Sequence, residues 1–411
     1  MKKSLGFSLA TLTAVVLLQN SNAFAYQLNA ADRTLSVTPG QTAQATTADL
    51  KSVLSYLSSL KDKSKPWRVL MAPGKYLVTS QLTVRNLQNV EFVSDMNKPA
   101  QLIKDASWNA TTGGEYLLNV TYSKNVSMIG MQFYGQTDYK NNADPVWPDQ
   151  GVYFGSCDTV LIRNNGFFNF GNSALRVATH ERDPIPGVNS RNTQVLNNLF
   201  NNVYQISTTT NDTVHGGTQN YLLQGNVFYN LRGSIKFATR TAGAENIKIL
   251  NNRVNGGSHY GIEINNYNNV EIRGNQLQNI QEFAMNIYTN TRATGSFNWG
   301  ENYTIADNVM TNVGKGLRFS TEPYADGTKV YGKNLQITNN IFNGVTNASF
   351  GGAAISQING NINGLSITSN QLNNIANKRY ISYTSGSTIT SYLNNLVNGV
   401  AYGPQQTTAT K

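Results

Sequence analysis

The sequence predicts an all-β protein that folds as a right-handed parallel β-helix, a solenoid of short coils. One phrase recurs along the chain: alternating aliphatic residues, then Asn-Asn or Gly-Asn, then a further apolar residue. The second asparagines of its copies are Asn165, Asn198, Asn226, Asn252, Asn275, Asn308, Asn340 and Asn370. Their uneven spacing, 23 to 33 residues, is typical of a β-helix with inserted loops, whereas leucine-rich and helical repeats keep a tighter period. The region has no 3.6-residue apolar rhythm, which excludes α-solenoids.

These asparagines are expected to form a ladder along the turns. A turn between two strands needs a left-handed or bridging backbone, which Asn and Gly tolerate best. Stacked coils place equivalent side chains about 4.8 Å apart, so the amides can hydrogen-bond along the stack. We therefore assign the repeated asparagines a structural role, with stacked aliphatic residues filling the interior.

The chain divides into four predicted segments. Residues 1–25 carry Lys2 and Lys3, an apolar stretch and a small-residue end, which is the pattern of a secretory signal peptide. Residues 26–66 form an N-terminal segment in which Thr47 to Leu60 shows helical spacing of Leu and Val after a Thr-Thr N-cap, predicting a short capping helix. Residues 67–400 form the predicted β-helix, and residues 401–411 form a polar tail.

Composition points to an anionic partner outside the cytoplasm. Charged residues make up only 13% of the chain, and the net charge is +10; loss of Lys2 and Lys3 leaves 10 − 2 = +8. A positive excess favours anionic partners, and an acidic polysaccharide fits an exported protein better than nucleic acid. No apolar run after the signal peptide is long enough to span a membrane. We expect a periplasmic or secreted monomer.

The capping helix, the segment 69–76 leading into 82–84, and the asparagine coils together resemble the pectin-lyase-like parallel β-helix superfamily over nearly the whole mature chain. The resemblance implies polysaccharide processing. It does not select one activity, because the superfamily includes lyases, hydrolases, epimerases, adhesins and phage depolymerases. The Asp-Asp and Gly-His-Gly pair of polygalacturonase-like hydrolases, the Asp-Pro-His-Asp of alginate epimerases and the Arg-x-Pro-x-x-Arg of pectate lyases are absent.

Another strand in each coil carries chemically varied outward residues. Leu175 and Val177 are apolar and point inward, so Arg176 points outward, and the other coils follow the same alternation. The resulting outward column is Tyr153, Arg176, Ser207, Lys236, Glu263, Asn286, Arg318 and Ser356. Small residues two positions earlier and long inserts after these strands predict a shallow, loop-walled groove for a sugar chain.

For a uronate polymer, this column favours cleavage by β-elimination, which needs a cation to neutralise the carboxylate and a base to remove the α-proton. Lys236 or Arg176 is the candidate base, lysine being the easier one, and Arg318 or Arg240 is the candidate cation. His180 is a rival base, because histidine titrates nearer neutral pH. The remaining catalytic candidate is Glu263, and the substrate-binding candidates are Tyr153, Asn286, Tyr288, Arg182 and Trp299.

Other interpretations stay open from the sequence. Lys236 and Glu263 on adjacent strands also suit a structural cross-strand ion pair. A glycoside hydrolase would need a second carboxylate about 5 to 9.5 Å from Glu263, and a non-catalytic protein would bind polysaccharide or serve exopolysaccharide export. No cofactor is indicated with certainty; calcium needs clustered carboxylates, for which Glu263 with Asp149 or Asp183 is the candidate set.

Overall fold

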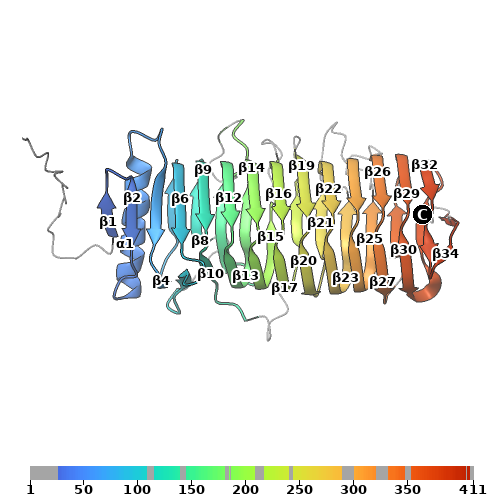
Figure 1. Cartoon of the computed structure of the whole chain (residues 1–411), viewed down its shortest axis with the longest axis horizontal. Coiled ribbons are helices and arrows are strands. Elements are labelled where there is room, and N and C mark those ends of the chain that lie inside the picture. Colours follow the sequence, from blue (N-terminus) through green and yellow to red (C-terminus); the bar gives the residue numbers. More distant parts are fainter. Residues whose placement is uncertain are drawn as a thin grey trace, which may run out of the picture.

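The computed structural model describes residues 26–108, 115–138, 145–180, 185, 187–208, 217–239, 244–288, 300–320, 332–347, 353–403 and 405–407. This part of the chain consists mostly of β-strands stacked into an elongated body, with a helix near the N-terminal end (Figure 1). The prediction of an all-β chain is confirmed. The proposed signal peptide lies outside the described residues. Within them, no helix is both long and apolar enough to cross a membrane.

The described strands form three stacks, and apart from one antiparallel pairing near each end of the body, each strand pairs in parallel with the equivalent strand of the next coil. Alternating apolar residues point into the body, as in β12 (Asp158–Arg163), where Val160 and Ile162 are buried and Leu161 faces outward. The other members of this first stack, which starts with an antiparallel hairpin, are β1 (Tyr26–Asn29), β2 (Thr34–Val37), β3 (Trp67–Met71), β6 (Gln88–Ser94), β9 (Lys124–Ile129), β14 (Arg191–Leu196), β16 (Gln219–Gln224), β19 (Glu245–Leu250), β22 (Asn268–Arg273), β24 (Glu301–Ala306), β26 (Gly332–Thr338), β29 (Ile362–Thr368) and β32 (Thr388–Leu393).

The second and third stacks are joined by four long strands that bend from one into the other, with shifts of register at the bend in two of the pairings. These bent strands are β13 (Gly166–Ala178), β15 (Leu199–Ser207), β23 (Gln276–Tyr288) and β25 (Val309–Ser320). Their first halves belong to the second stack, with β4 (Gly74–Val78), β7 (Ala100–Lys104), β10 (Gln132–Tyr134), β17 (Val227–Leu231), β20 (Arg253–Gly257), β27 (Ile341–Val345), β30 (Gln371–Ile375), β33 (Leu396–Val397) and β34 (Val400–Ala401). Their second halves belong to the third stack, with β5 (Leu82–Arg85), β8 (Tyr116–Thr121), β11 (Gln150–Gly155), β18 (Ile235–Ala238), β21 (Ile262–Asn265), β28 (Ile355–Ile358), β31 (Ile381–Thr384) and β35 (Gln405–Thr407).

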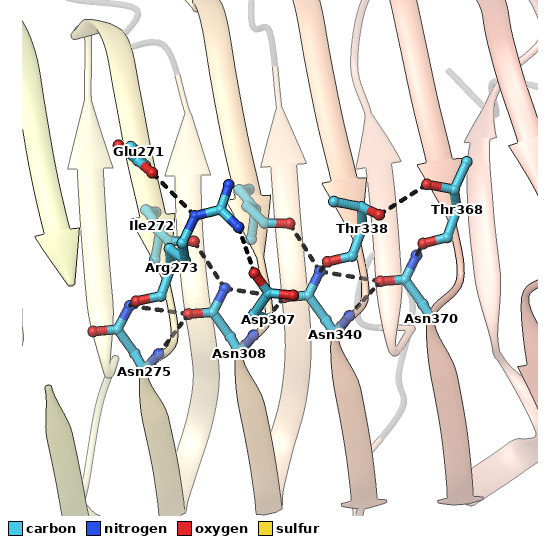
Figure 2. A network of polar contacts seen from close by, with 11 residues as sticks. Glu271, Ile272, Arg273, Asn275, Asp307, Asn308, Thr338, Asn340, Thr368 and Asn370 are labelled. Carbon is cyan, nitrogen blue, oxygen red and sulfur yellow. Dashed lines mark hydrogen bonds and ion pairs between the residues drawn. The ribbon is translucent and has the colours of Figure 1, made fainter. Parts of the chain in front are cut away.

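The predicted asparagine ladder is confirmed at the turn between the first and second stacks. From Asn165 to Asn370, each Nδ2 donates to Oδ1 of the next asparagine at 2.9 to 3.1 Å. The last bond reaches Asn395, which extends the ladder one coil beyond the predicted series. Figure 2 shows four consecutive members, Asn275, Asn308, Asn340 and Asn370. Each of the four also donates to a main-chain carbonyl of a neighbouring coil. The ladder asparagines are buried, and their polar atoms are satisfied along the stack.

The left-handed backbone belongs to the residue before each ladder asparagine, not to the ladder asparagine itself. Asn164, Asn197 and Asn251 have φ of 57°, 55° and 53°, and glycine takes this place at Gly225 and Gly274. Two consecutive positions of the turn therefore have different roles. The first supplies the left-handed conformation that Asn and Gly tolerate, and the second supplies the hydrogen-bonding side chain.

The capping helix is confirmed, but it starts earlier than predicted. Helix α1 spans Ala43–Ser59, and its N-cap is Thr42, whose side chain accepts a bond from the Ala45 amide at 3.1 Å. The Thr-Thr pair lies inside the helix, where Thr47 donates back to the Ala43 carbonyl. The helix packs its buried leucines and valine against β4 and β5, so it covers the apolar end of the stack.

Stacked aromatic residues fill part of the interior. Phe133, Phe167, Phe200 and Phe228 lie one above another with ring centroids 4.7 to 5.0 Å apart. At the other end of the body, the predicted polar tail, residues 401–411, contains β35, which pairs in parallel with β31. A short 3₁₀ turn at Ala376–Lys378 follows β30.

Candidate functional site

The predicted outward column is aligned by the pairing of the third-stack strands. Arg176 pairs with Tyr153 on one side and Ser207 on the other, and Glu263 lies between Lys236 and Asn286 in the same way. The remaining pairings, Ser207 with Lys236, Asn286 with Arg318 and Arg318 with Ser356, complete the series. The register read from the sequence is therefore confirmed, whereas the roles of the residues stay predictions.

The column is less open than a shallow groove would be. Tyr153, Glu263 and Asn286 are 5%, 3% and 1% exposed, whereas Arg176 and Arg318 are half-buried. The side chains of Arg176 and Arg318 therefore reach the surface, whereas their neighbours in the column are buried.

The small residues beside the column have a structural cause. A Cβ added at Gly151 would lie 2.1 Å from the carbonyl oxygen of Ala174, and one added at Gly316 would lie 2.1 Å from that of Ala354. Real Cβ atoms do not approach backbone oxygen so closely. The glycines beside the column therefore allow the backbones of adjacent coils to approach closely, which gives them a structural role apart from the shallow groove predicted from the sequence.

Glu263 is the centre of a buried polar group, which we call the glutamate cluster. Its Oε1 lies 3.2 Å from Lys236 Nζ and accepts bonds from Tyr288 Oη at 3.0 Å and Asn265 Nδ2 at 3.3 Å. Its Oε2 accepts a bond from Ser234 Oγ at 2.9 Å. Lys236 is therefore held as the ion-pair partner of Glu263, the structural alternative that the sequence left open. These described partners include no second carboxylate of the kind a glycosidase pair requires.

Two buried amide atoms beside Glu263 have no hydrogen-bond partner. They are Asn286 Nδ2, a donor, and Asn265 Oδ1, an acceptor. Unsatisfied buried polar atoms are rare in native proteins and mark strain, function or an absent partner molecule. Tyr288 completes the surroundings: burial first, and then the negative charge of Glu263, raises the pKa of the Tyr288 hydroxyl, which keeps it a donor.

Arg318 is held at the C-terminal side of the glutamate cluster. Its Nε donates to Asn286 Oδ1 at 2.7 Å, and its guanidinium lies 4.5 Å from the ring centroid of Phe283. The Lys315 ammonium lies 4.8 Å from the same ring centroid. The site thus presents two cations around one aromatic ring.

A second group, the tyrosine–histidine cluster, lies at the N-terminal part of the column. The rings of Tyr116 and Tyr153 stack with centroids 4.7 Å apart, and Tyr153 Oη lies 3.2 Å from His180 Nδ1. Arg176 Nη1 donates to Tyr116 Oη at 3.1 Å, and its guanidinium carbon lies 5.6 Å from the Tyr153 ring centroid. The His180 backbone amide donates to the Ser156 hydroxyl at 2.9 Å, which holds the His180 backbone just after the end of β13.

Several predicted residues lie outside the described part of the chain: Arg182, Arg240 and Trp299, together with Asp183 of the calcium alternative. Three residues that contact the column were not predicted: Tyr116, Asn265 and Phe283. Ser234 was predicted only as one of the small residues two positions before the column, and the structure adds its bond to Glu263. Asn265 lies two positions after Glu263 on the same strand face, so extending the alternation by one step would have found it.

Asp149 does not serve as a free carboxylate ligand. Its Oδ1 lies 3.1 Å from Lys104 Nζ, and both side chains are buried. Its Oδ2 accepts bonds from the amides of Gln136, Thr137 and Gly171, each at 3.0 Å. Burial lowers the pKa of Lys104, against the opposing effect of Asp149. Within the described ranges, no three His, Cys, Asp or Glu residues gather as metal ligands do.

Comparison with known proteins identifies the fold. No protein-family model and no curated protein sequence matches the chain. Two structures of PfbA, a surface adhesin of Streptococcus pneumoniae, are similar to it, with TM-scores of 0.60 and 0.58 at 14% and 15% identity. The alignments cover 85% and 88% of this chain and 87% and 96% of PfbA.

A hyperthermoactive exopolygalacturonase from Thermotoga maritima is also similar, with a TM-score of 0.51, 15% identity, and coverage of 89% of this chain and 92% of the enzyme. Identities this low establish shared architecture and leave activity open. The chain therefore has the fold of the pectin-lyase-like parallel β-helix proteins, as the sequence resemblance indicated.

Proposed function

We propose that the protein is an exported, right-handed parallel β-helix that binds an acidic polysaccharide along the outward column and cleaves it by β-elimination. Right-handedness is supported by the general rule that parallel crossover connections are right-handed in about 98% of cases. Export is supported by the signal-peptide pattern of residues 1–25. The observation that carries the enzymatic proposal is the contact of Tyr153 Oη with His180 Nδ1 beside the Arg176 guanidinium.

The tyrosine–histidine cluster contains the groups that β-elimination needs. Arg176 pairs with the uronate carboxylate and makes the α-proton more acidic. His180 accepts that proton, its electron pair forms the new C=C bond, and the bond to the leaving oxygen breaks. Tyr153 donates a proton to the leaving oxygen and recovers one from His180 through their hydrogen bond. The net change is the transfer of one proton from carbon to oxygen, with no other reactant.

The glutamate cluster serves binding rather than proton abstraction. An ammonium that is paired with Glu263 holds no free electron pair for a base, so the role first assigned to Lys236 passes to His180. Arg318 lies five strand positions from Arg176, or roughly 24 Å at about 4.8 Å per strand, and it contacts a second carboxylate of an extended chain. The unsatisfied amide atoms of Asn286 and Asn265 suit sugar hydroxyls between these two cations.

A second candidate is binding without cleavage. The Lys236–Glu263 pair and the burial of Tyr153 favour it, because both observations fit a column whose charges stabilise the strands. Retained binding with no product after prolonged incubation supports this candidate.

The test uses the mature protein with polygalacturonate, alginate and hyaluronate, and it measures the ultraviolet absorbance of unsaturated uronate. We expect product from at least one polymer, with the rate reduced about 10²- to 10⁴-fold in His180→Gln and Tyr153→Phe. Arg253→Gln, which removes an exposed cation of the second stack, is the matched control and should leave the rate unchanged. Because Arg176 supplies the positive charge, we expect EDTA to have no effect. Absence of unsaturated product from all three polymers contradicts the lyase proposal.

A further inference from the structure

A hollow of about 500 Å³ lies at the turn between the first and second stacks, away from the outward column. Four successive coils line it, at the turns that lead into β7, β10, β13 and β15, and none of its lining residues is charged. Its volume falls within the range of about 300 to 1,000 Å³ that is typical of small-molecule sites.

The hollow lies where the asparagine ladder starts. In the coil before Asn165, the ladder position is held by Met131, whose amide donates to Asn165 Oδ1 at 2.9 Å. Methionine cannot continue the amide ladder, so the polar series ends here and the hollow has an apolar side. The apolar residues of the lining are Met96, Pro99, Met131, Phe168 and Leu199.

Three amide side chains that line the hollow have donors or acceptors available for a ligand: Gln132, Asn164 and Asn197. Among the described residues, the side-chain amides of Asn164 and Asn197 make no hydrogen bond to the protein, and both lie in the left-handed turn position. Gln132 uses Oε1 to accept bonds from Gln101 Nε2 at 3.0 Å and Tyr134 Oη at 2.8 Å. These bonds orient Gln132, whose Nε2 keeps its donors for a ligand.

An aromatic ring completes the lining. Phe168 is half-buried and stacks on Tyr134, with centroids 4.7 Å apart and planes inclined by 16°. A Cβ at Gly166 would lie 2.5 Å from the Phe168 ring, so glycine lets this ring lie against the backbone. The next coil places Asn201 opposite Phe168, so the outward aromatic stack ends at the hollow.

We propose that this hollow binds a neutral carbohydrate, separately from the acidic polymer that the outward column binds. Sugar rings present apolar C–H faces and polar hydroxyl edges. Phe168, with Met96 and Pro99, packs against such a face, and the amides of Gln132, Asn164 and Asn197 bond the hydroxyls in both directions. The absence of charge from the lining favours an uncharged ligand over a uronate.

The test measures binding of cellohexaose to the mature protein by isothermal titration calorimetry and by saturation-transfer NMR. We expect binding that Phe168→Ala weakens at least tenfold. Tyr229→Ala is the matched control, because Tyr229 is an exposed outward aromatic residue of the same stack, 38% exposed and outside the hollow. Asn197→Asp is a second variant that keeps the left-handed turn, since Asp307 occupies the equivalent position in a later coil, and it should also weaken binding.

Two further measurements separate this site from the outward column. Raising the salt concentration should leave cellohexaose binding unchanged, because no charged group lines the hollow, and His180→Gln should not alter it. No detectable binding overturns the proposal. So does binding that tolerates both Phe168→Ala and Asn197→Asp, or that polygalacturonate displaces competitively. If Phe168→Ala fails to fold, Asn197→Asp decides alone. Failure here leaves the lyase proposal standing, because that proposal is scored by unsaturated product.

Discussion

The buried asparagine ladder and the outward column both run along the described part of the molecule, but they differ in how their polar groups are satisfied. The ladder at the first turn repeats one residue, and each asparagine bonds the next coil and the main chain. The outward column of the third stack changes residue at every coil, and two buried amide atoms stay unsatisfied there, one at Asn286 in the column and one at Asn265 beside Glu263. Repeated asparagines whose polar atoms are all hydrogen-bonded stabilise the fold, whereas variable residues with unsatisfied buried atoms indicate a functional site.

The comparison also separates two uses of buried polarity. The ladder satisfies neutral groups with neutral groups, so it stabilises the fold at little electrostatic cost. The outward column buries the Glu263 carboxylate with Lys236 beside it, and a buried ion pair contributes weakly to stability after desolvation. Four substitutions test this difference.

The largest loss is expected from Asn252→Ala in the middle of the ladder. Asn252 is buried. Its Nδ2 donates to Asn275 Oδ1 and to the Leu223 carbonyl, and its Oδ1 accepts from both the side-chain amide and the backbone N–H of Asn226. The alanine leaves these buried groups unpaired, so the free energy of unfolding should fall by about 3 to 5 kcal/mol. Guanidinium denaturation followed by circular dichroism measures it, and a loss below about 1 kcal/mol would remove the structural role of the ladder.

Lys236→Met should cost about 2 to 3 kcal/mol, because it leaves the Glu263 carboxylate buried without its cation. The double variant Lys236→Met with Glu263→Gln should recover most of that loss, since glutamine needs no counter-charge. Equal stability of the two variants in the same denaturation experiment would show that the unpaired Glu263 charge is not the cause of the loss, and it would contradict this prediction.

Gly316→Ala should cost about 1 to 3 kcal/mol through overpacking against the Ala354 carbonyl. Gly403→Ala is the control, because a Cβ there meets nothing within 4 Å. If Gly316→Ala leaves the free energy of unfolding unchanged, close backbone approach is not the reason for a small residue at this position.

The smallest effect is expected from Asn246→Gly. Asn246 belongs to a second, exposed row of asparagines near the first residues of the first-stack strands, in which Asn220 also bonds Asn192. Asn246 bonds Asn220 at 3.0 Å on the surface, and glycine tolerates its φ of 62°. We expect a change below about 1 kcal/mol in the thermal and guanidinium transitions, since water replaces the lost bond. A loss as large as that of Asn252→Ala would mean that burial does not distinguish the two ladders.

The repeated features of the structure, the asparagine ladder and the register of the outward column, could be predicted from the sequence. Asn165 to Asn370 were placed in one ladder, and the alternation around Arg176 gave the register of the outward column. The start of α1 was wrong because Thr42 and Thr47 are equally good N-cap types and only the Thr42 backbone is extended. The burial of Tyr153 and the contact of Tyr116 with Arg176 were missed, because they depend on side chains that reach across coils. No periodic pattern encodes such contacts.

The central claim is that the outward column, and not the positive charge of the whole chain, recognises an acidic polysaccharide. The direct measurement is polygalacturonate affinity by calorimetry for three variants that each remove one positive charge. Arg176→Gln and Arg318→Gln remove it from the outward column, and Arg253→Gln removes it from the second stack. We expect about tenfold weaker binding for Arg176→Gln and Arg318→Gln and unchanged binding for Arg253→Gln. Equal weakening by all three would show that net charge alone attracts the polymer, and it would contradict the account.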